Sequence, residues 1–200
     1  MSQPRKMSGR EKALLASEKV FAEYGFDGAT MDQIAETAGI NKMLIYYHFK
    51  GKEQILAELI RINIQDVIDH IDLFLPETQH MNEDYIRNFV DQLFNFFEKK
   101  RNILRILTIE GMKLSTKDTS FFEIIEPVQQ AFIQKLKKMG ASLQDDSMIN
   151  IRSFFIYQIP LMIYFTMGEK YSEYYHIDKV ELENKFKATF FEMVQLSVLA

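Results

Sequence analysis

The sequence predicts an all-α protein in which an N-terminal three-helix head is joined to a larger C-terminal helical bundle, about nine helices in all. Three observations lead to this prediction. Apolar residues recur at helical spacing along most of the chain, no stretch alternates as a strand does, and capping residues stand where the helical periodicity breaks. We expect the head to cover residues 1–51 and the body to cover residues 52–200.

The first two helices of the head are bounded by turn and capping residues. Apolar residues at helical spacing predict a helix from about Ser8 to Gly25. Thr30 is a favourable N-cap, and Gln33 three residues later completes a capping-box pattern. A second helix is therefore expected over Met31–Ala38.

Residues 35–49 have the pattern of two short helices packed across a tight turn. Ala35 supplies the small residue that close helix packing needs, and Gly39 supplies a residue that tolerates positive φ. Asn41 is placed to cap a third helix over Lys42–His48. The polar, aromatic and cationic side chains of this helix suit contact with a nucleic-acid backbone, so the segment predicts a helix-turn-helix.

The body is expected to consist of longer helices. One begins near Lys52 and is stopped by Pro76. The others are predicted over Asp84–Lys100, Arg101–Leu114, Thr119–Lys138, Asp145–Tyr175 and Val180–Leu199. Pro127 is expected to kink or break its helix near Glu126, and Pro160 is expected to kink the helix that contains it.

Composition and charge limit the possible functions. The chain has no cysteine and a polar N-terminus, so we expect a cytoplasmic protein without disulfides or thiolate metal sites.

The charge is distributed unevenly along the chain. Residues 1–52 carry 8 Lys and Arg against 6 Asp and Glu, whereas residues 53–200 carry 16 against 22, which gives a mildly basic head on an acidic body. The uncharged segment 153–168 would span about 24 Å as a helix, short of the roughly 30 Å of a bilayer core, so no membrane partner is expected. Catalytic and phosphate-binding motifs are absent from the sequence, so we expect no enzyme, no cofactor and no metal.

The head resembles the DNA-binding domain of the TetR family of bacterial transcriptional repressors. The resemblance rests on Val20, Phe21, Gly25, Thr30, Ile34, Ala35, Ala38, Gly39, Ile40, Lys42, Tyr46, Tyr47, His48, Phe49, Lys52 and Leu56. Met43 departs from the family pattern, because many members have glycine at the start of the recognition helix. A side chain at this position would meet the base edges directly, so the operator sequence cannot be taken from a relative.

The resemblance implies a set of DNA-binding residues. They are Thr30, Asn41, Lys42, Met43, Leu44, Tyr46, Tyr47, His48 and Lys52. Thr30 and Lys52 stand at helix starts, where a phosphate is favoured, and Lys42 can reach a phosphate or a guanine edge. Met43 and Leu44 are expected to face the bases.

Three of these residues resemble residues that, in TetR-family proteins, contact the DNA backbone through ring hydroxyls and imidazole. They are Tyr46, Tyr47 and His48. Each also has a simpler explanation. One of the two tyrosines could be a core aromatic, and His48 could be satisfied at the end of its helix.

A single recognition helix reads few base pairs, and two-fold dimers place two such helices about one DNA turn apart. The resemblance therefore implies a homodimer, and the interface residues expected on the last helix are Leu182, Phe186, Phe190 and Met193. It also implies a pocket for a small hydrophobic inducer, and the side chains expected to line it are Phe89, Phe97, Phe122, Phe155, Tyr157 and Tyr164. The predicted function is a dimeric repressor that binds a palindromic operator in double-stranded DNA and is released by a lipophilic or aromatic ligand in the body. The alternative is a helical DNA-binding or protein-interaction regulator with no small-molecule inducer.

Overall fold

The computed structural model describes residues 7–71, 82–113, 119–138 and 146–199, and every regular element in these ranges is a helix. The head contains α1 (Gly9–Gly28), α2 (Met31–Ala38) and α3 (Lys42–His48). The body contains α4 (Lys52–Asp69), α6 (Glu83–Glu98), α7 (Arg101–Met112), α8 (Ser120–Lys138), α9 (Asp146–Ile151), the π-helical η1 (Arg152–Gln158), α10 (Ile159–Tyr175) and α11 (Lys179–Leu199). Because α9, η1 and α10 follow one another without a break, these ranges hold nine helices, as the sequence predicts. The predicted helix stop at Pro76 lies outside the described residues.

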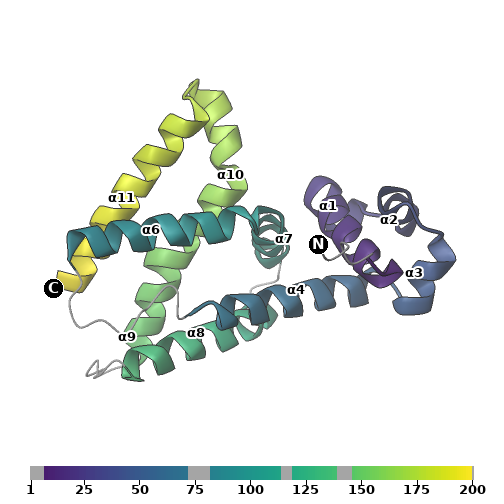
Figure 1. Ribbon diagram of the computed structural model, residues 1–200, viewed down its shortest axis with the longest axis horizontal. Coiled ribbons are helices and arrows are strands. Elements are labelled where there is room, and N and C mark those ends of the chain that lie inside the picture. The colour runs from purple at the N-terminus through teal and green to yellow at the C-terminus, as the bar shows by residue number, and fades with distance from the viewer. Residues whose placement is uncertain (1–6, 72–81, 114–118, 139–145, 200) are drawn as a thin grey trace, which may run out of the picture.

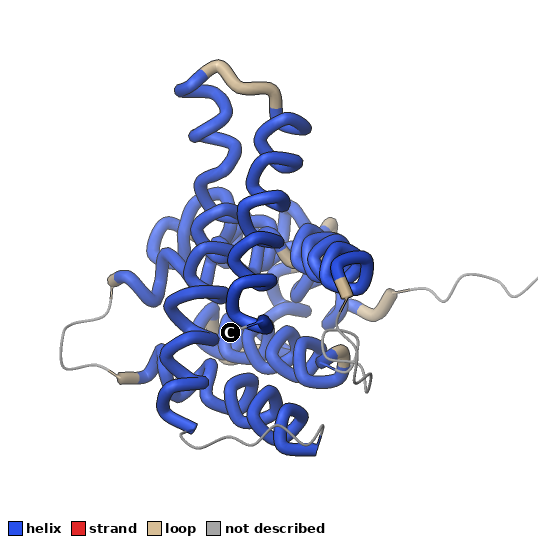
Figure 2. Tube along the Cα trace, turned by 90° about the vertical axis from the view of Figure 1, so that its left-hand side faces the viewer, coloured by secondary structure: helices blue, strands red, loops and turns tan. Residues whose placement is uncertain are grey.

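The head lies at one end of an elongated body (Figure 1). α4 leaves the head and packs beside α8 along one side of the body. α7 packs against α1 of the head and against α10 of the body, so it contacts both parts. α10 and α11 form a hairpin whose turn projects away from the other helices (Figure 2).

The boundaries of α2 and α3 follow from local capping, as predicted, whereas α1 extends to Gly28, beyond the predicted end at Gly25. Thr30 caps α2 and forms the reciprocal capping box with Gln33. Gly39 ends α2 in the left-handed region at φ 60°, where a Cβ would be strained. Asn41 caps α3 by accepting from the backbone N–H of Met43 at 2.8 Å. The predicted bounds of α2 and α3 are therefore confirmed.

The two prolines inside the body helices differ in how they compare with the prediction. α8 continues across Pro127, so the break expected near Glu126 is wrong. Ile125 and Ile133, on either side of this proline, are buried, and the packing of α8 against α4 compensates for one missing hydrogen bond. Pro160 is the second residue of α10, separated from the end of the π-helical η1 by Ile159. A π-helical turn is one way in which a long helix accommodates a residue that has no N–H, and the predicted kink at Pro160 stays a prediction.

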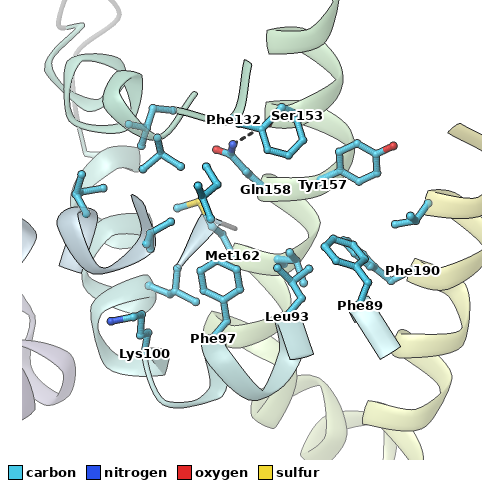
Figure 3. Close-up of a pocket in the computed structure, with 18 of the residues that line it drawn as sticks. Phe89, Leu93, Phe97, Lys100, Phe132, Ser153, Tyr157, Gln158, Met162 and Phe190 are labelled. Carbon is cyan, nitrogen blue, oxygen red and sulfur yellow. Dashed lines mark hydrogen bonds between the residues drawn. The ribbon is translucent and has the colours of Figure 1, made fainter. Parts of the chain in front are cut away.

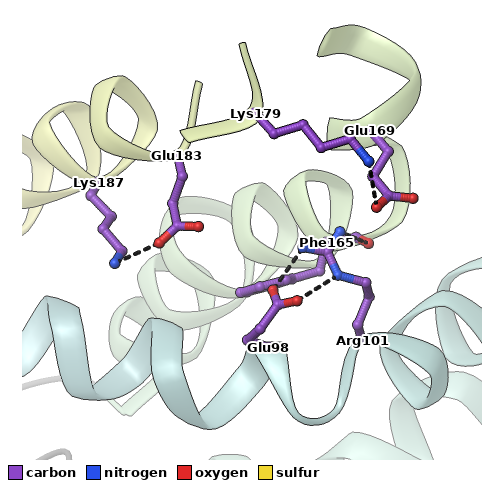
Figure 4. Close-up of polar contacts among 7 residues, drawn as sticks. All are labelled: Glu98, Arg101, Phe165, Glu169, Lys179, Glu183 and Lys187. Atoms are coloured by element: carbon purple, nitrogen blue, oxygen red, sulfur yellow. Dashed lines mark hydrogen bonds and ion pairs between the residues drawn. The ribbon is translucent and has the colours of Figure 1, made fainter. Parts of the chain in front are cut away.

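Polar contacts tie the body helices to one another (Figure 4). Arg101 at the start of α7 donates from Nε and Nη2 to the carboxylate of Glu98, at 3.1 and 2.7 Å. Its Nη1 donates to the carbonyl oxygen of Phe165 in α10 at 3.5 Å. Across the α10–α11 hairpin, Lys179 Nζ lies 3.2 Å from the carboxylate of Glu169. These contacts link α6, α7 and α10, and link α10 to α11.

Head and body share one hydrophobic core. Phe21 and Ile34 of the head are buried in the same cluster as Ile103, Ile106 and Leu107 of α7. Buried apolar contacts resist sliding, because protein interiors are close-packed. A shift of α7 would therefore displace the head residues packed against it. The predicted boundary between head and body, at residues 51 and 52, stays a prediction.

Glu58→Gln is expected to weaken the junction between α1 and α4 in a pH-dependent way. Hydrogen bonds from Arg61 and Arg10, at 3.0 and 2.7 Å, lower the pKa of Glu58 from 4.5 to about 2. A pKa lowered by folding stabilises the protein above pH 4.5, and this stabilisation is lost as the pH falls from 4.5 towards 2. We expect the variant to lose about 1 kcal/mol at pH 7 and the difference to vanish near the folded pKa, measured by urea unfolding across this range.

The control for this prediction is Glu83→Gln, which removes an exposed pair with Arg87 on α6. Exposed ion pairs contribute little, so this variant should change the free energy of unfolding by less than about 0.5 kcal/mol. An effect of Glu58→Gln that stays constant with pH would contradict the assigned role of its carboxylate.

Candidate functional site

α3 is held against the head by its buried face. Ile45 and Phe49 are buried, and together with Ile34 of α2 they belong to the head core. The opposite face of α3 is exposed: Tyr47 is 82% exposed, Met43 is 73% exposed and Tyr46 is 45% exposed. The alternative that one tyrosine is a core aromatic is therefore wrong.

The cationic and hydroxyl groups of this surface are already oriented by neighbouring residues. Lys42 Nζ lies 2.8 Å from Asp32 Oδ2, and this hydrogen bond raises the pKa of the lysine. Thr30 Oγ1 accepts from the backbone N–H of Gln33 at 3.3 Å and donates to its side-chain oxygen at 2.9 Å. His48 is half-buried, with its ring centroid 5.0 Å from that of Tyr47. The start of α2 and the exposed face of α3 thus offer hydroxyl, ammonium and aromatic groups together.

Two expected DNA-binding residues are engaged within the head instead. Lys52 Nζ donates to three backbone carbonyl oxygens, so its charge stabilises the end of α1 and the turn after it, and the expected phosphate contact is not supported. These acceptors belong to Phe26, Asp27 and Ala29, at 2.8, 3.1 and 3.3 Å. Leu44 packs on Gly9, where an added Cβ would lie 2.7 Å from Leu44 Cδ2. Leu44 is nevertheless 38% exposed and Met43 is 73% exposed, so contact of either side chain with the bases stays a prediction, with Met43 the more accessible of the two.

A cavity of about 340 Å³ lies inside the body (Figure 3). Its walls come from α4, α6, α7, α8, the η1–α10 helix and α11. The walls are mostly apolar, and the side chains with polar groups among them are Asn63, Tyr85, Lys100, Ser153, Tyr157 and Gln158. This volume and composition are typical of a site for a lipophilic small molecule.

The one charged side chain in the cavity wall is neutralised by a partner. Lys100 Nζ donates to Asn63 Oδ1 at 2.9 Å and forms an ion pair with Asp66. On another part of the wall, Gln158 Nε2 donates to Ser153 Oγ at 2.9 Å. The lining therefore offers no uncompensated charge to a buried ligand.

Half of the aromatic residues predicted for the pocket line this cavity. Phe89, Phe97 and Tyr157 do so. Phe122 and Phe155 do not line this cavity; both are exposed, and they line a separate, smaller pocket, so their role in ligand binding stays a prediction. The prediction is wrong for Tyr164, whose ring stacks on Phe186 at 4.3 Å and whose pKa is raised by burial to about 12.

Most of the cavity wall consists of aliphatic residues that sequence reasoning missed. Examples are Ile64, Val67, Leu104, Leu107, Ile125 and Val128. The signal that could have found them is the apolar stripe of each helix, interrupted by a polar side chain such as Asn63 or Lys100. The sequence prediction named only aromatic residues, because the chain is rich in phenylalanine and tyrosine, and so it missed the aliphatic lining.

The interface predicted on α11 faces largely inward. Phe190 is 2% exposed and lines the cavity, so its assignment to the dimer interface is wrong. Phe186 and Met193 pack against the same core cluster, and they are half-buried within their own subunit. Leu182 is half-exposed, and its role stays a prediction. The apolar face of an amphipathic helix such as α11 packs into the core of its own subunit, so it is not available to a second subunit.

The helix over Ser147–Tyr175 is long and apolar enough to cross a membrane by length and composition alone. Leu161 and Phe165 are buried in the body, as in the core helix of a globular protein, whereas Phe155 and Met167 are exposed. Part of this apolar helix is therefore left uncovered in the single chain.

The head matches a known family. Residues 13–59 match the family model described as bacterial regulatory proteins, tetR family. The HTH-type transcriptional activator FasR of Mycolicibacterium smegmatis is 28% identical over 98 residues, which cover 49% of this chain. The matched segment spans only 44% of FasR, less than half of its length. IcaR of Staphylococcus aureus, the negative transcriptional regulator of the biofilm operon icaADBC, is 27% identical over 143 residues, 71% of this chain and 73% of IcaR.

The fold of the whole chain also has solved relatives. The transcriptional regulator FadR from Bacillus subtilis, solved in complex with stearoyl-CoA, superposes with a TM-score of 0.61. The two share 18% sequence identity, and the match covers 90% of this chain and 96% of FadR. At 18% sequence identity, the structural similarity to FadR supports a shared fold and no shared function. From the helix-turn-helix geometry and the family match together, the head of this chain, residues 13–59, belongs to the TetR family of bacterial regulatory proteins.

Proposed function

We propose that this protein is a cytoplasmic, dimeric repressor that binds a palindromic operator and is released by a lipophilic ligand in the body. The observation that carries the proposal is the apolar cavity, because two of its walls, α4 and α7, also pack against α1 of the head. A ligand that changes the spacing of these walls would change the position of the head. The inducer-free alternative is less well supported, because its interior would have to be filled by its own side chains.

In the proposed complex, the exposed face of α3 enters the major groove. Lys42 and Thr30 hold phosphates, Tyr46 and Tyr47 contact the backbone, and Met43 meets the bases. A thioether side chain offers apolar contact to thymine methyl groups rather than hydrogen bonds. Met43 therefore favours an operator with thymine at the position it faces.

The chemistry of the cavity favours an uncharged group inside it. Lys100 already forms its ion pair with Asp66, so a buried carboxylate would find no free cation. An acyl chain that keeps its polar end outside meets this requirement, and the stearoyl-CoA bound to FadR is a ligand of this kind. We therefore infer an acyl thioester or a neutral lipophile rather than a free fatty acid.

The second subunit is proposed to pack against the α10–α11 hairpin. Tyr171, Tyr174, Tyr175 and Val180 are exposed within a few residues of the turn between α10 and α11, and Met167 of α10 is exposed as well. Large exposed apolar surfaces commonly mark contacts with a partner. This face replaces the inward stripe of α11 as the proposed dimer contact.

The test is release of the protein from DNA by defined ligands. Fluorescence anisotropy with a labelled fragment of the promoter of its own gene should show tight binding that stearoyl-CoA reverses. Coenzyme A alone should have no effect, and sodium stearate should be at least about tenfold less effective, because its carboxylate would lose hydrogen bonds to water on burial. Binding to DNA that no lipophile changes would support the inducer-free alternative.

A further inference from the structure

Three helices that hold the head meet beside Lys100, on the wall of the large cavity. Lys100 lies directly before α7, and its carbonyl oxygen accepts from the backbone N–H of Leu104 at 3.0 Å. Its Nζ reaches across to α4, where it donates to Asn63 Oδ1 at 2.9 Å and pairs with Asp66. On the side of α1, burial raises the pKa of Glu18, and the charge of Lys100 acts on the same carboxylate in the opposite direction. One side chain therefore connects α7 with α4 and faces α1.

The two ends of the Lys100 side chain have different surroundings. Its hydrocarbon stem forms part of the cavity wall, whereas its nitrogen points away from Phe97 and Met162, towards its partners on α4 (Figure 3). The side chain is 12% exposed, and its nitrogen lies 5.1 Å from the ring centroid of Phe96. Lysine commonly packs its stem on apolar surface and keeps its ammonium at a polar site. A lipophile in the cavity would therefore press on the stem without meeting the charge.

α7 is attached to the head by apolar packing. Ile103 and Leu107 line the cavity and also belong to the core cluster that contains Phe21 and Ile34 of the head. Ile103 is 2% exposed and Leu107 is 9% exposed. Close-packed side chains of this kind cannot slide without opening voids, so we expect α7 and α1 to move together.

The contact between Lys100 and α4 is of a different kind. It consists of a hydrogen bond and an ion pair, and the carboxylate of Asp66 is 40% exposed. Water can replace a polar partner at such a position at little cost in free energy. When the cavity fills, we therefore expect this contact to open before the packing between α7 and α1 does.

α4 can carry a change at Lys100 to the recognition helix α3. α4 begins at Lys52, shortly after the end of α3, and contains Asp66 in its last turn. Ile55 and Leu59, between these two positions, are buried in the core shared with the head. Each residue adds about 1.5 Å of rise, so Lys52 and Asp66 each lie roughly 10 Å from Leu59. A rigid helix that tilts about this packed segment moves both of its ends by similar amounts.

We propose that Lys100 is the positioning residue that couples the cavity to the recognition helix. In the empty protein it holds α4 against α7, in the tilt that suits operator binding. A lipophile that presses on its stem moves the ammonium away from Asn63 and Asp66, and α4 tilts and carries α3 with it. The inference rests on the proposed function and adds to it the contact that changes when the ligand binds.

Lys100→Met tests this role, because it keeps an unbranched apolar stem on the cavity wall and removes the ammonium. The variant should resemble the ligand-bound protein, so operator affinity without ligand should fall at least about tenfold. Its affinity for stearoyl-CoA should rise in return, since the ligand no longer has to break the contact with α4. Stearoyl-CoA should also weaken operator binding less than it does in the unaltered protein. Anisotropy with labelled operator and calorimetry with stearoyl-CoA measure the two affinities.

The affinity for the ligand distinguishes coupling from damage. A variant that is merely distorted would lose affinity for both operator and stearoyl-CoA, whereas an uncoupled one gains affinity for stearoyl-CoA. An operator affinity equal to that of the unaltered protein, or an affinity for stearoyl-CoA that is unchanged or lower, would overturn the proposal.

Two further variants assign the effect to the contact with α4. Asp66→Ala removes one partner of the ammonium at a partly exposed helix position, so it should shift both affinities in the same directions by a smaller factor, and it decides the matter if Lys100→Met does not fold. Lys99→Met makes the same replacement one residue earlier, at an exposed position outside the cavity, and should leave both affinities unchanged. Unchanged affinities in Asp66→Ala, or equal shifts in Lys99→Met and Lys100→Met, would contradict the assignment.

The unaltered protein separates this proposal from the proposed function. Failure of stearoyl-CoA to release it from DNA would refute the proposed function and the coupling with it. Release of the unaltered protein, together with equal operator affinity and equal release of Lys100→Met, would refute the coupling alone.

Discussion

Lys42→Ala is expected to lower operator affinity by at least about tenfold and to reduce the slope of log affinity against log salt by about two for the dimer. The physical reason is that each subunit would lose one ammonium placed at the exposed face of α3, where it is held by Asp32. The loss should be similar for specific and non-specific DNA, since a phosphate contact carries no sequence information. Fluorescence anisotropy over a series of salt concentrations measures both quantities.

The matched control is Lys99→Ala, an exposed lysine of the body on the turn between α6 and α7. It removes the same charge far from α3 and should leave the salt slope unchanged. Tyr47→Phe separates the hydroxyl from the ring: a weaker, salt-independent loss of affinity is expected, because a neutral hydrogen bond releases no counterion. An unchanged salt slope in Lys42→Ala, with the dimer intact, would show that α3 does not carry the phosphate contact assigned to it.

Val128→Phe is expected to abolish the response to ligand while DNA binding is retained. Val128 is half-buried on α8 and lines the cavity, so a phenylalanine ring there would occupy space that the ligand needs. Overfilling a packed interior typically costs about 1–3 kcal/mol, so ligand affinity should fall at least about tenfold. Calorimetry with stearoyl-CoA measures the affinity, and anisotropy with labelled operator measures the release.

Val128→Ile provides the graded comparison, since it adds a single methylene at the same position. It should reduce ligand affinity only slightly and should leave release intact. α8 packs against α4 but does not belong to the head, so a change in operator affinity without ligand is not expected from either variant. If Val128→Phe were released from DNA as readily as the unaltered protein, the ligand would have to act outside this cavity.

The head could be predicted closely from the sequence because its determinants are local. Thr30, Gly39 and Asn41 act on the backbone within a few residues of themselves, through caps and a left-handed turn. Such effects are independent of how distant segments pack. The same reasoning failed at Lys52, because its partners are carbonyl groups more than twenty residues earlier in the chain.

The helices of the body could be predicted from the sequence, but the surroundings of their apolar side chains could not. Helical periodicity identifies the apolar stripe of a helix, and it assigned such a stripe to Phe186 and Phe190 correctly. It cannot distinguish the core of the same subunit, a cavity wall and a contact with a second copy, since all three are apolar. Phe190 proved to line the cavity, and Phe155 proved to be exposed.

The sequence by itself determined the all-helical fold of the described residues, the boundaries of α2 and α3, and the helix-turn-helix pattern that matches the family, because each rests on short-range backbone chemistry. Only the tertiary structure decided that aliphatic side chains from six body segments enclose the cavity and that Asp66 neutralises Lys100 at its wall. Among the described residues, it alone left the side-chain oxygens of Gln129 and Asn150 buried without hydrogen-bond partners. Cavities and unpaired atoms arise where helices distant in the chain meet, and local sequence carries no information about how closely they approach.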